Sequence, residues 1–421
     1  MFSLVDINNC YVSCERVFDL KLHNKPVVVL SNNDGCVIAR SNEVKKLGVK
    51  MGEPAYQQEK FFEQNGVYVY SSNYQLYGDM STRLMTTLQE FTPNMEVYSI
   101  DEAFLDLTGF EHLGLKDYGE KITSTVLQYT GLPVSMGIAK TKTLTKIANK
   151  FAKKFAGYHN VCMIDTEDKL KKALQLTDVN DVWGIGYRMT KRLNNQGIKT
   201  AYDFTQASQS FVRKHYTVTG ERTWMELQGI KCFELEENPP VKKQICTSRA
   251  FPVAVTDYEE LREAIATYAS CCAAELRDQK TFAMSLMVFI HTNNFSNNDL
   301  QYWNNRVVQL PFSNNSTSQI VKHALAGLKD IFISGYKYKK AGVIITEISP
   351  VVQKNLFCDF NFEKDRRLMN VVDMYSKGFV KDDLKLAVQG TGERNWRLKQ
   401  EHKSPCYTTD LNDVIRINCR I

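Results

Sequence analysis

Three acidic residues lie inside strand-forming sequence and have the chemistry of metal ligands. Asp6 interrupts the apolar run Phe2–Ile7, and Asp101 with Glu102 interrupts the run Val97–Leu107. Carboxylates among Val, Ile, Tyr and Phe are costly unless their charge is neutralised, which a bound divalent cation does. If the two runs pair, the three acids are candidates for a site that holds two metal ions roughly 3.5–4 Å apart and catalyses in-line phosphoryl transfer.

The same residues allow a simpler interpretation. Asp101 and Glu102 could form the polar turn of a hairpin, and Asp6 could be a surface residue. Neighbouring side chains of a regular strand point to opposite faces, so Asp101 and Glu102 can share a site only if the chain bends there. These residues alone leave both interpretations open.

The surrounding elements indicate how the acids could meet. Between residues 75 and 165 the pattern predicts helix, strand, strand, helix, strand and helix. With the first strand this is a β-α-β-β-α-β order, the ferredoxin-like arrangement, which can place the first strand beside the hairpin carrying Asp101. The predicted elements are Gln75–Phe91, Glu96–Ile100, Ala103–Leu107, Lys116–Tyr129, Val134–Ile138 and Lys142–Phe155.

A small module is predicted at residues 20–74, after the first strand. Its strand Pro26–Leu30 leads through the turn sequence Asn33-Asp34-Gly35 into a partner strand at 36–39. The module therefore interrupts the ferredoxin-like pattern without belonging to it.

One predicted helix carries an unusual charge pattern. Lys142, Lys146, Lys150 and Lys154 recur every four residues on one face, and no acid lies between them to relieve their repulsion. Such a face is often merely solvated, but a polyanion such as DNA would relieve the repulsion.

A second segment also suits DNA. The sequence Val182-Trp183-Gly184-Ile185-Gly186 precedes a basic helix that carries Lys191. An apolar lead-in, two glycines and a basic helix are typical of a helix-hairpin-helix element, whose backbone N–H groups contact phosphates without reading sequence. The alternative is an ordinary tight turn between helices.

The second half of the chain predicts another domain. The polar stretch 234–240 indicates a linker, after which a second β-α-β-β-α-β run follows. Beyond that run, Gln353-Lys354-Asn355-Leu356-Phe357 has the pattern of a short peptide that docks an apolar pair into a partner. The predicted elements of the run are Gln244–Phe251, Tyr258–Asp278, Thr281–His291, Gln301–Leu310, Ser316–Ile333 and Lys339–Ile348.

The composition limits the class of protein. A chain of 421 residues is long enough for several domains, and 43% hydrophobic and 24% charged residues without a long apolar span are typical of a soluble protein with no membrane segment. The first residues carry no basic leader, which argues against a signal peptide. The 11 cysteines include no C-x-x-C pair, so reduced thiols and a cytoplasmic location are expected.

Taken in order, these motifs resemble the Y-family translesion DNA polymerases along the whole chain, and most of all their bacterial UmuC-type branch. The resemblance implies an α+β, multidomain right-hand polymerase. It is carried by Asp6 with Cys10-Tyr11, Ser31–Arg40, Tyr98–Phe104, Gly137–Leu144 and Val182–Gly186. The implied parts are a ferredoxin-like palm at 1–19 and 75–165, small fingers at 20–74, a helical thumb with the helix-hairpin-helix element at 166–238, a βαββαβ little finger at 241–350, and a clamp-binding motif with a UmuC-type tail at 351–421.

For the site, the resemblance implies that Asp6, Asp101 and Glu102 are catalytic and bind two Mg²⁺ ions, with the carbonyl of Ile7 available to one ion. Tyr11 falls at the steric gate, where a ring under the sugar excludes a 2′-hydroxyl. Without the resemblance, Tyr11 would be interpreted as a core residue.

The resemblance also assigns residues to the other ligands. Lys153 and Lys45 match triphosphate-binding positions, although many relatives have Tyr and Arg where this chain has Asn42 and Lys45. Lys45 keeps the charge but loses the bidentate fork of arginine. The implied DNA contacts are Lys142, Lys146, Gly184, Ile185, Gly186 and Lys191, and the implied sliding-clamp contacts are Gln353, Leu356 and Phe357.

The implied activity is template-directed, low-fidelity translesion synthesis from dNTPs on primer-template DNA, in the SOS response and without proofreading. The implied partners are the sliding clamp, a UmuD′-type accessory dimer and a RecA filament, and the implied location is nucleoid-associated. Two alternatives stay open. One is a metal-dependent nuclease that uses the same carboxylates, and the other is a non-catalytic DNA-binding repair factor.

Overall fold

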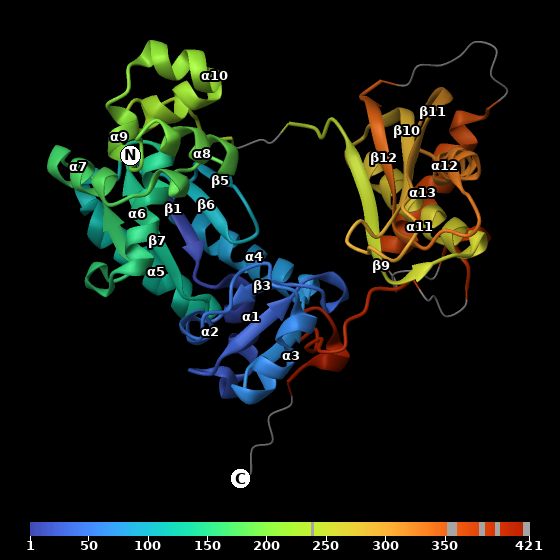
Figure 1. Cartoon of the computed structure of the whole chain (residues 1–421), viewed down its shortest axis with the longest axis horizontal. Coiled ribbons are helices and arrows are strands. Elements are labelled where there is room, and N and C mark those ends of the chain that lie inside the picture. Colours follow the sequence, from blue (N-terminus) through green and yellow to red (C-terminus); the bar gives the residue numbers. More distant parts are fainter. Residues whose placement is uncertain (237–239, 352–359, 379–383, 392–395, 416–421) are drawn as a thin grey trace, which may run out of the picture. The chain divides into compact units, whose positions relative to one another are not determined.

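The computed structural model describes residues 1–236, 240–351, 360–378, 384–391 and 396–415 (Figure 1). The chain forms two compact units, of which the first contains Met1–Pro239 together with Gln400–Ile421 and the second contains Pro240–Lys399. The polypeptide therefore leaves the first unit and returns to it near the C-terminus. None of the helices within the described ranges is long and apolar enough to cross a membrane.

A five-stranded sheet of order β5-β6-β1-β7-β8 forms the centre of the first unit. Its first four strands are antiparallel and have the order of the ferredoxin-like arrangement, which confirms that prediction. The fifth strand lies parallel to β7 at the sheet edge, outside the predicted elements. The strands are β5 (Met95–Val97), β6 (Glu102–Asp106), β1 (Phe2–Ile7), β7 (Val134–Ala139) and β8 (Val161–Met163).

Three helices with the predicted boundaries, to within two residues, cover this sheet: α4 (Tyr74–Gln89), α5 (Leu115–Thr130) and α6 (Lys142–Lys154). Alternate strand residues such as Val5 and Leu105 share a core cluster with α4 and α5. On the opposite face, α6 lies so close to β7 that a Cβ on Gly137 would collide with the backbone of α6. That close contact fixes the height of α6 above β1, which carries Asp6.

Helix α1 follows β1, and the module at 20–74 contains a three-stranded sheet of order β3-β2-β4. Strands β2 and β3 form the predicted hairpin, and β4 pairs with β2 in parallel. Asn33 and Asp34 have positive φ in the hairpin turn, a conformation that Asn and Asp tolerate. The elements are α1 (Cys10–Phe18), β2 (Val27–Leu30), β3 (Val37–Arg40), α2 (Asn42–Lys46), α3 (Ala55–Gln64) and β4 (Tyr68–Ser71).

The stretch after β8 is helical and shares a core cluster with α6, in which Leu193 and Phe204 are fully buried. The short 3-10 helix Val179–Asp181 and α8 enclose the G-I-G turn. The helices are α7 (Glu167–Gln175), α8 (Tyr187–Asn195), α9 (Ala201–Thr205) and α10 (Gln209–Leu227).

The second unit confirms the second β-α-β-β-α-β run. Its antiparallel sheet has the order β11-β10-β12-β9, and one core cluster joins the sheet to its two long helices. The elements are β9 (Ile245–Val255), α11 (Tyr258–Asp278), β10 (Phe282–Thr292), β11 (Trp303–Asn314), α12 (Thr317–Ile331) and β12 (Tyr338–Ser349).

The remaining residues are more than a simple tail. Helix α13 (Phe362–Gly378) packs within the second unit, where Arg277 donates two hydrogen bonds to Asp373, at 2.8 and 2.7 Å. Residues 400–415 pack within the first unit instead, and Lys403 forms a β-bridge with Ser71 at the end of β4.

Candidate active site

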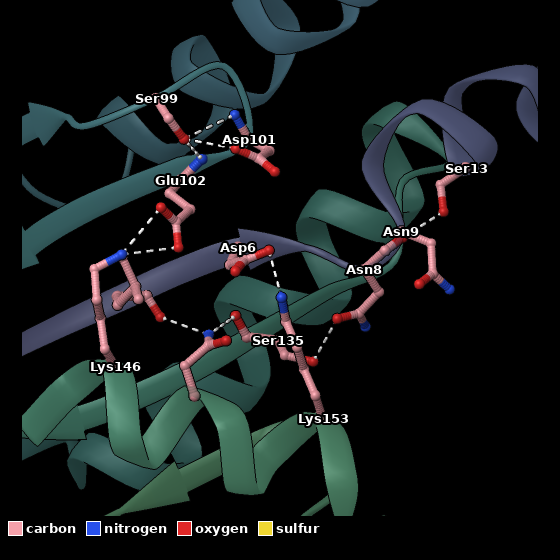
Figure 2. A network of polar contacts seen from close by, with 12 residues as sticks. Asp6, Asn8, Asn9, Ser13, Ser99, Asp101, Glu102, Ser135, Lys146 and Lys153 are labelled. Carbon is pink, nitrogen blue, oxygen red and sulfur yellow. Dashed lines mark hydrogen bonds and ion pairs between the residues drawn. The ribbon is translucent and has the colours of Figure 1, made fainter. Parts of the chain in front are cut away.

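The pairing of β1 with β6 brings the predicted acidic residues together. Asp6 and Glu102 are direct partners across the two strands, and the N–H of Ile7 donates to the carbonyl of Asp101 at 3.0 Å. Figure 2 shows Asp6, Asp101 and Glu102 around this pair of strands. The juxtaposition expected from the ferredoxin-like topology is therefore present.

The required bend is also present, in the turn between β5 and β6. The Ser99 hydroxyl donates to Asp101 Oδ1 at 2.6 Å and accepts from the Glu102 N–H at 3.1 Å. Asp101 thus lies in the polar turn while Glu102 begins the strand. One short turn thus serves as a hairpin connection and also presents a carboxylate beside Asp6.

Lysines from α6 pair with two of the carboxylates. Lys153 Nζ lies 2.5 Å from Asp6 Oδ1, and Lys146 Nζ lies 3.0 Å from both oxygens of Glu102 (Figure 2). Burial raises the pKa of Asp6 to about 7, Lys153 opposes that rise, and the nearby Glu102 and Asp101 add to it. The site is therefore a concentration of negative charge that needs cations.

The donor set suits a hard divalent cation such as Mg²⁺. Three carboxylates and the Ile7 carbonyl offer oxygen ligands only. Among the residues that the structure describes, however, no three acidic, histidine or cysteine side chains converge closely enough to hold one ion. The lysine-paired rotamers explain this, since Glu102 is turned to Lys146 and Asp6 to Lys153. In this arrangement a lysine neutralises each of the two carboxylates.

A cavity of about 590 Å³ adjoins the carboxylates. Its volume is in the range of sites for small molecules and cofactors. Its lining includes the acids Asp6 and Asp101 and the cations Arg40, Lys45 and Lys153. Arg40 was not among the predicted site residues, although it is the last residue of the motif Ser31–Arg40. The lining includes Asp6, Ile7, Asn9, Tyr11, Arg40, Asn42, Lys45, Asp101 and Lys153.

The predicted triphosphate residue Lys45 reaches this cavity from α2. Its Nζ donates to Asn9 Oδ1 at 2.6 Å, and Asn9 Nδ2 donates to Asn42 Oδ1 at 3.2 Å. Burial and the neighbouring charges of Arg40 and Lys153 lower the pKa of Lys45. Three cations close enough to affect one another favour an anionic ligand.

Tyr11 lines the same cavity from the first turn of α1. Its ring stacks on the Tyr77 ring, with centroids 4.5 Å apart and planes 13° apart, and meets the Tyr74 ring edge-on at 5.9 Å. Burial is the main cause that raises the pKa of Tyr11 to about 12. Tyr11 is thus both packed against the core and exposed to the cavity.

The prediction of a DNA-binding lysine face on α6 is wrong for Lys142. Lys142 is 4% exposed and forms an ion pair with Glu96, so it has no surface for a phosphate. Lys146 points to Glu102, and Lys150 pairs with Asp181. The acids that relieve the repulsion come from other elements, where helix periodicity could not reveal them.

The residues of the predicted G-I-G turn have two different environments. Ile185 is buried in the helical core and its N–H donates to the Val182 carbonyl at 3.0 Å, so it anchors the turn rather than meeting a ligand. Gly184 has φ +90°, which favours glycine, and Gly186 is exposed immediately before α8. Lys191 is exposed on α8. The predicted clamp-binding residues Gln353, Leu356 and Phe357 lie outside the described residues.

Comparison with known proteins identifies the family. Residues 5–150 match the model of the impB/mucB/samB family, residues 242–356 match the model of that family's C-terminal domain, and residues 366–417 match a domain of unknown function. The protein UmuC of Salmonella typhimurium is 44% identical over 99% of this chain and 100% of its own length. The protein ImpB of Salmonella typhimurium is 39% identical over 98% and 99%, and DNA polymerase IV 2 of Bacillus subtilis is 28% identical over 85% and 87%.

Solved structures share the fold. A Y-family DNA polymerase chimera of Dbh and Dpo4 matches with a TM-score of 0.65 and 22% identity, over 82% of this chain and 98% of its own. The insertion ternary complex of Dbh DNA polymerase matches with a TM-score of 0.54 and 21% identity, over 83% and 99%. The chain belongs to the impB/mucB/samB family, the UmuC-type branch of the Y-family translesion DNA polymerases.

Proposed function

We propose that this protein is a DNA-directed DNA polymerase that copies damaged templates with low fidelity and without proofreading, by transferring a nucleotide from a dNTP to the primer 3′-hydroxyl. One observation carries the proposal. A single cavity joins two carboxylates on adjacent elements, Asp6 and Asp101, to the ring of Tyr11 and to three cations. A nuclease needs the carboxylates, but it needs neither a ring beside them nor a cationic wall for a triphosphate.

The proposed domain assignment follows the sheets and the helical stretch, and shared core clusters join the palm to the fingers and to the thumb. The palm is the five-stranded sheet with its helices, at 1–19 and 75–165, and the fingers are the module at 20–74. The thumb is the helical core at 166–238, and the little finger is the second sheet at 241–350.

The proposed cofactor is a pair of Mg²⁺ ions held by Asp6, Asp101, Glu102 and the carbonyl of Ile7. When bound, such ions lower the pKa of an attacking hydroxyl and stabilise charge on the departing pyrophosphate. The chain contributes the position of the ligands through the β1–β6 pairing and the Ser99 turn.

The proposed roles of the other residues concern the nucleotide. Lys153, once separated from Asp6, joins Arg40 and Lys45 in holding the triphosphate. Tyr11 closes the sugar side of the cavity and excludes a 2′-hydroxyl.

Gly184, Gly186 and Lys191 contact the DNA backbone. The proposed partners are the sliding clamp through Gln353–Phe357, a UmuD′-type dimer and a RecA filament.

Primer extension tests the proposal. The assay uses an undamaged and an abasic template with Mg²⁺, four dNTPs and the proposed accessory proteins, and it compares the natural chain with Asp101→Ala. Glu90→Ala, which changes an exposed acid after α4, is the matched control. We expect extension on both templates by the natural chain and the control, and loss of extension with retained DNA binding in Asp101→Ala.

The other outcomes identify the alternatives. Shortening of the primer in the absence of dNTPs would indicate a nuclease. DNA binding without extension, despite the accessory proteins, would indicate a non-catalytic repair factor. Equal extension by Asp101→Ala would mean that the acidic residues take no part in the reaction.

A further inference from the structure

Residues 400–414, here called the returning segment, pack along the end of β4 and the start of α4 in the first unit. The N–H of Ser71 donates to the His402 carbonyl at 3.0 Å, and the N–H of His402 donates to Ser71 Oγ at 3.0 Å. Further along, the ring of Tyr407 stacks on Phe18, with centroids 4.9 Å apart. The returning segment falls within the part of the chain that matches a domain of unknown function.

The returning segment completes the N-terminal cap of α4. Asn73 is fully buried, and its Oδ1 accepts from the N–H of Leu76 at 3.4 Å. Its amide nitrogen donates to the carbonyl and the hydroxyl of Ser404, both at 3.1 Å, and to the carbonyl of Pro405 at 3.2 Å. The orientation of the capping side chain therefore depends on a segment more than 300 residues away in the sequence.

Ser404 also reaches a buried acid. Its hydroxyl donates to Glu15 Oε1 at 3.0 Å, and the same oxygen accepts the hydroxyl of Tyr77 at 2.6 Å. Glu15 is 1% exposed and Tyr77 is fully buried. A buried carboxyl group depends on its hydrogen-bond partners, and losing one of them leaves a buried polar group short of partners. One carboxylate oxygen thus links the returning segment to the hydroxyl of Tyr77.

The ring of Tyr77 connects these hydrogen bonds to the cavity. Tyr77 stacks on Tyr11, and Tyr74 meets Tyr11 edge-on, so both contacts come from the first turn of α4. The contacts run from Ser404 through Glu15 and Tyr77 to the ring of Tyr11.

We propose that the returning segment positions the sugar-discriminating ring, with Ser404, Glu15 and Tyr77 as positioning residues for Tyr11. This inference rests on the proposed role of Tyr11. A 2′-hydroxyl differs from hydrogen by one oxygen atom, so a small shift of the ring is enough to admit it. The domain of unknown function thereby acquires a role in choosing deoxynucleotides over ribonucleotides.

The test is the ratio of kcat/KM for a dNTP to kcat/KM for the matching rNTP, measured by single-nucleotide insertion with the full chain. The variants are Ser404→Ala, Tyr77→Phe and their double variant. Tyr77→Phe keeps the stacked ring and removes only the hydroxyl. His402→Ala is the control, because that side chain is exposed and its residue contacts Ser71 through the backbone alone.

We expect each single variant to lower the ratio about threefold to tenfold, because only part of the energy of a buried hydrogen bond is transmitted to the ring. The double variant should be no worse than the stronger single variant, since both act on one carboxylate oxygen. His402→Ala should leave the ratio unchanged. A structural loss alone would lower both kcat/KM values equally, and an unchanged ratio in the Ser404→Ala and Tyr77→Phe variants would overturn the inference.

The Tyr11→Ala variant separates this inference from the proposed function. If Tyr11→Ala does not increase ribonucleotide insertion, the gate assignment itself is wrong. If Tyr11→Ala increases it and the Ser404 and Tyr77 variants do not, the gate stands and the role of the returning segment is wrong.

Discussion

Lys153 and Asp6 form an ion pair, with Nζ and Oδ1 2.5 Å apart, at the wall of the cavity that both residues line. The proposed function gives these residues different ligands, a triphosphate for Lys153 and a metal ion for Asp6. In this structure each neutralises the other. If the proposed function holds, an exchange of partners couples metal binding at Asp6 to triphosphate binding at Lys153.

Removing Lys153 tests this coupling. In Lys153→Ala we expect Mn²⁺ to bind the free protein more tightly, because Asp6 no longer has a competing cation. We also expect kcat/KM for a dNTP to fall by about tenfold or more, the loss associated with one charged hydrogen bond. Titration of Mn²⁺ by electron paramagnetic resonance and single-nucleotide insertion measure the two effects. Lys154→Ala, at the exposed neighbouring position, is the control. Unchanged Mn²⁺ affinity in Lys153→Ala would contradict the coupling.

Lys142 is expected to stabilise the fold rather than to bind DNA. Its ammonium group is buried against Glu96, whose Oε2 also accepts the N–H of Glu236 at 2.7 Å. Lys142→Met leaves Glu96 without its cation, so the free energy of unfolding should fall by about 3–5 kcal/mol. Urea unfolding measures this loss, and fluorescence anisotropy of the folded variant should give an unchanged affinity for DNA. A large drop in DNA affinity with normal stability would restore the DNA-binding assignment.

The acids and the lysines show what the sequence alone could reveal. Asp6 and Asp101 interrupt apolar strands, so their positions signal a site, and the ferredoxin-like order of elements predicts that they meet. The i, i+4 spacing of the α6 lysines predicts a common face but not what covers it. Glu96, the partner of Lys142, is 46 residues away, and no local pattern links the two.

Other features depend still more on tertiary contacts. Strand β8 has three residues and forms only because β7 offers it a free edge. Arg40 becomes a site residue because β3 ends at the cavity. Ser404 and Glu15 are 389 residues apart, so the return of the chain to the first unit has no signal in the local sequence.

The contact between β7 and α6 predicts a severe effect for one small substitution. A Cβ on Gly137 would collide with the backbone of Asn149 and Thr145, and backbone cannot move aside as a side chain can. We expect Gly137→Ala to lower the free energy of unfolding by about 3 kcal/mol or more. Thermal unfolding measures it, with Gly157→Ala as the matched control because nothing lies within 4 Å of a Cβ there. Equal melting temperatures for both variants would mean that α6 does not lie so close to the sheet.

The raised pKa of Glu15 predicts how the free energy of unfolding depends on pH. Burial raises its pKa from 4.5 to about 7, although the hydrogen bonds from Tyr77 and Ser404 act in the opposite direction and the nearby Asp19 adds to the rise. The other titratable groups that act on it are the phenols of Tyr70, Tyr77 and Tyr407, which stay neutral in this range. The folded protein therefore holds a proton between pH 4.5 and about 7 that the unfolded chain has released.

The sign of the effect follows from that proton. The stabilising contribution of Glu15 is fully present below pH 4.5, the ordinary pKa, and is lost as the pH rises through about 7. Glu15→Gln keeps the acceptor oxygen and cannot ionise. We therefore expect the natural chain to lose up to roughly 3 kcal/mol of stability relative to Glu15→Gln between pH 5 and pH 8. Urea unfolding of both proteins across this range measures the difference, in which the titration of all other groups cancels. Parallel curves would mean that Glu15 ionises as easily in the folded protein as in the unfolded chain, and that its burial between Ser404 and Tyr77 has no electrostatic consequence.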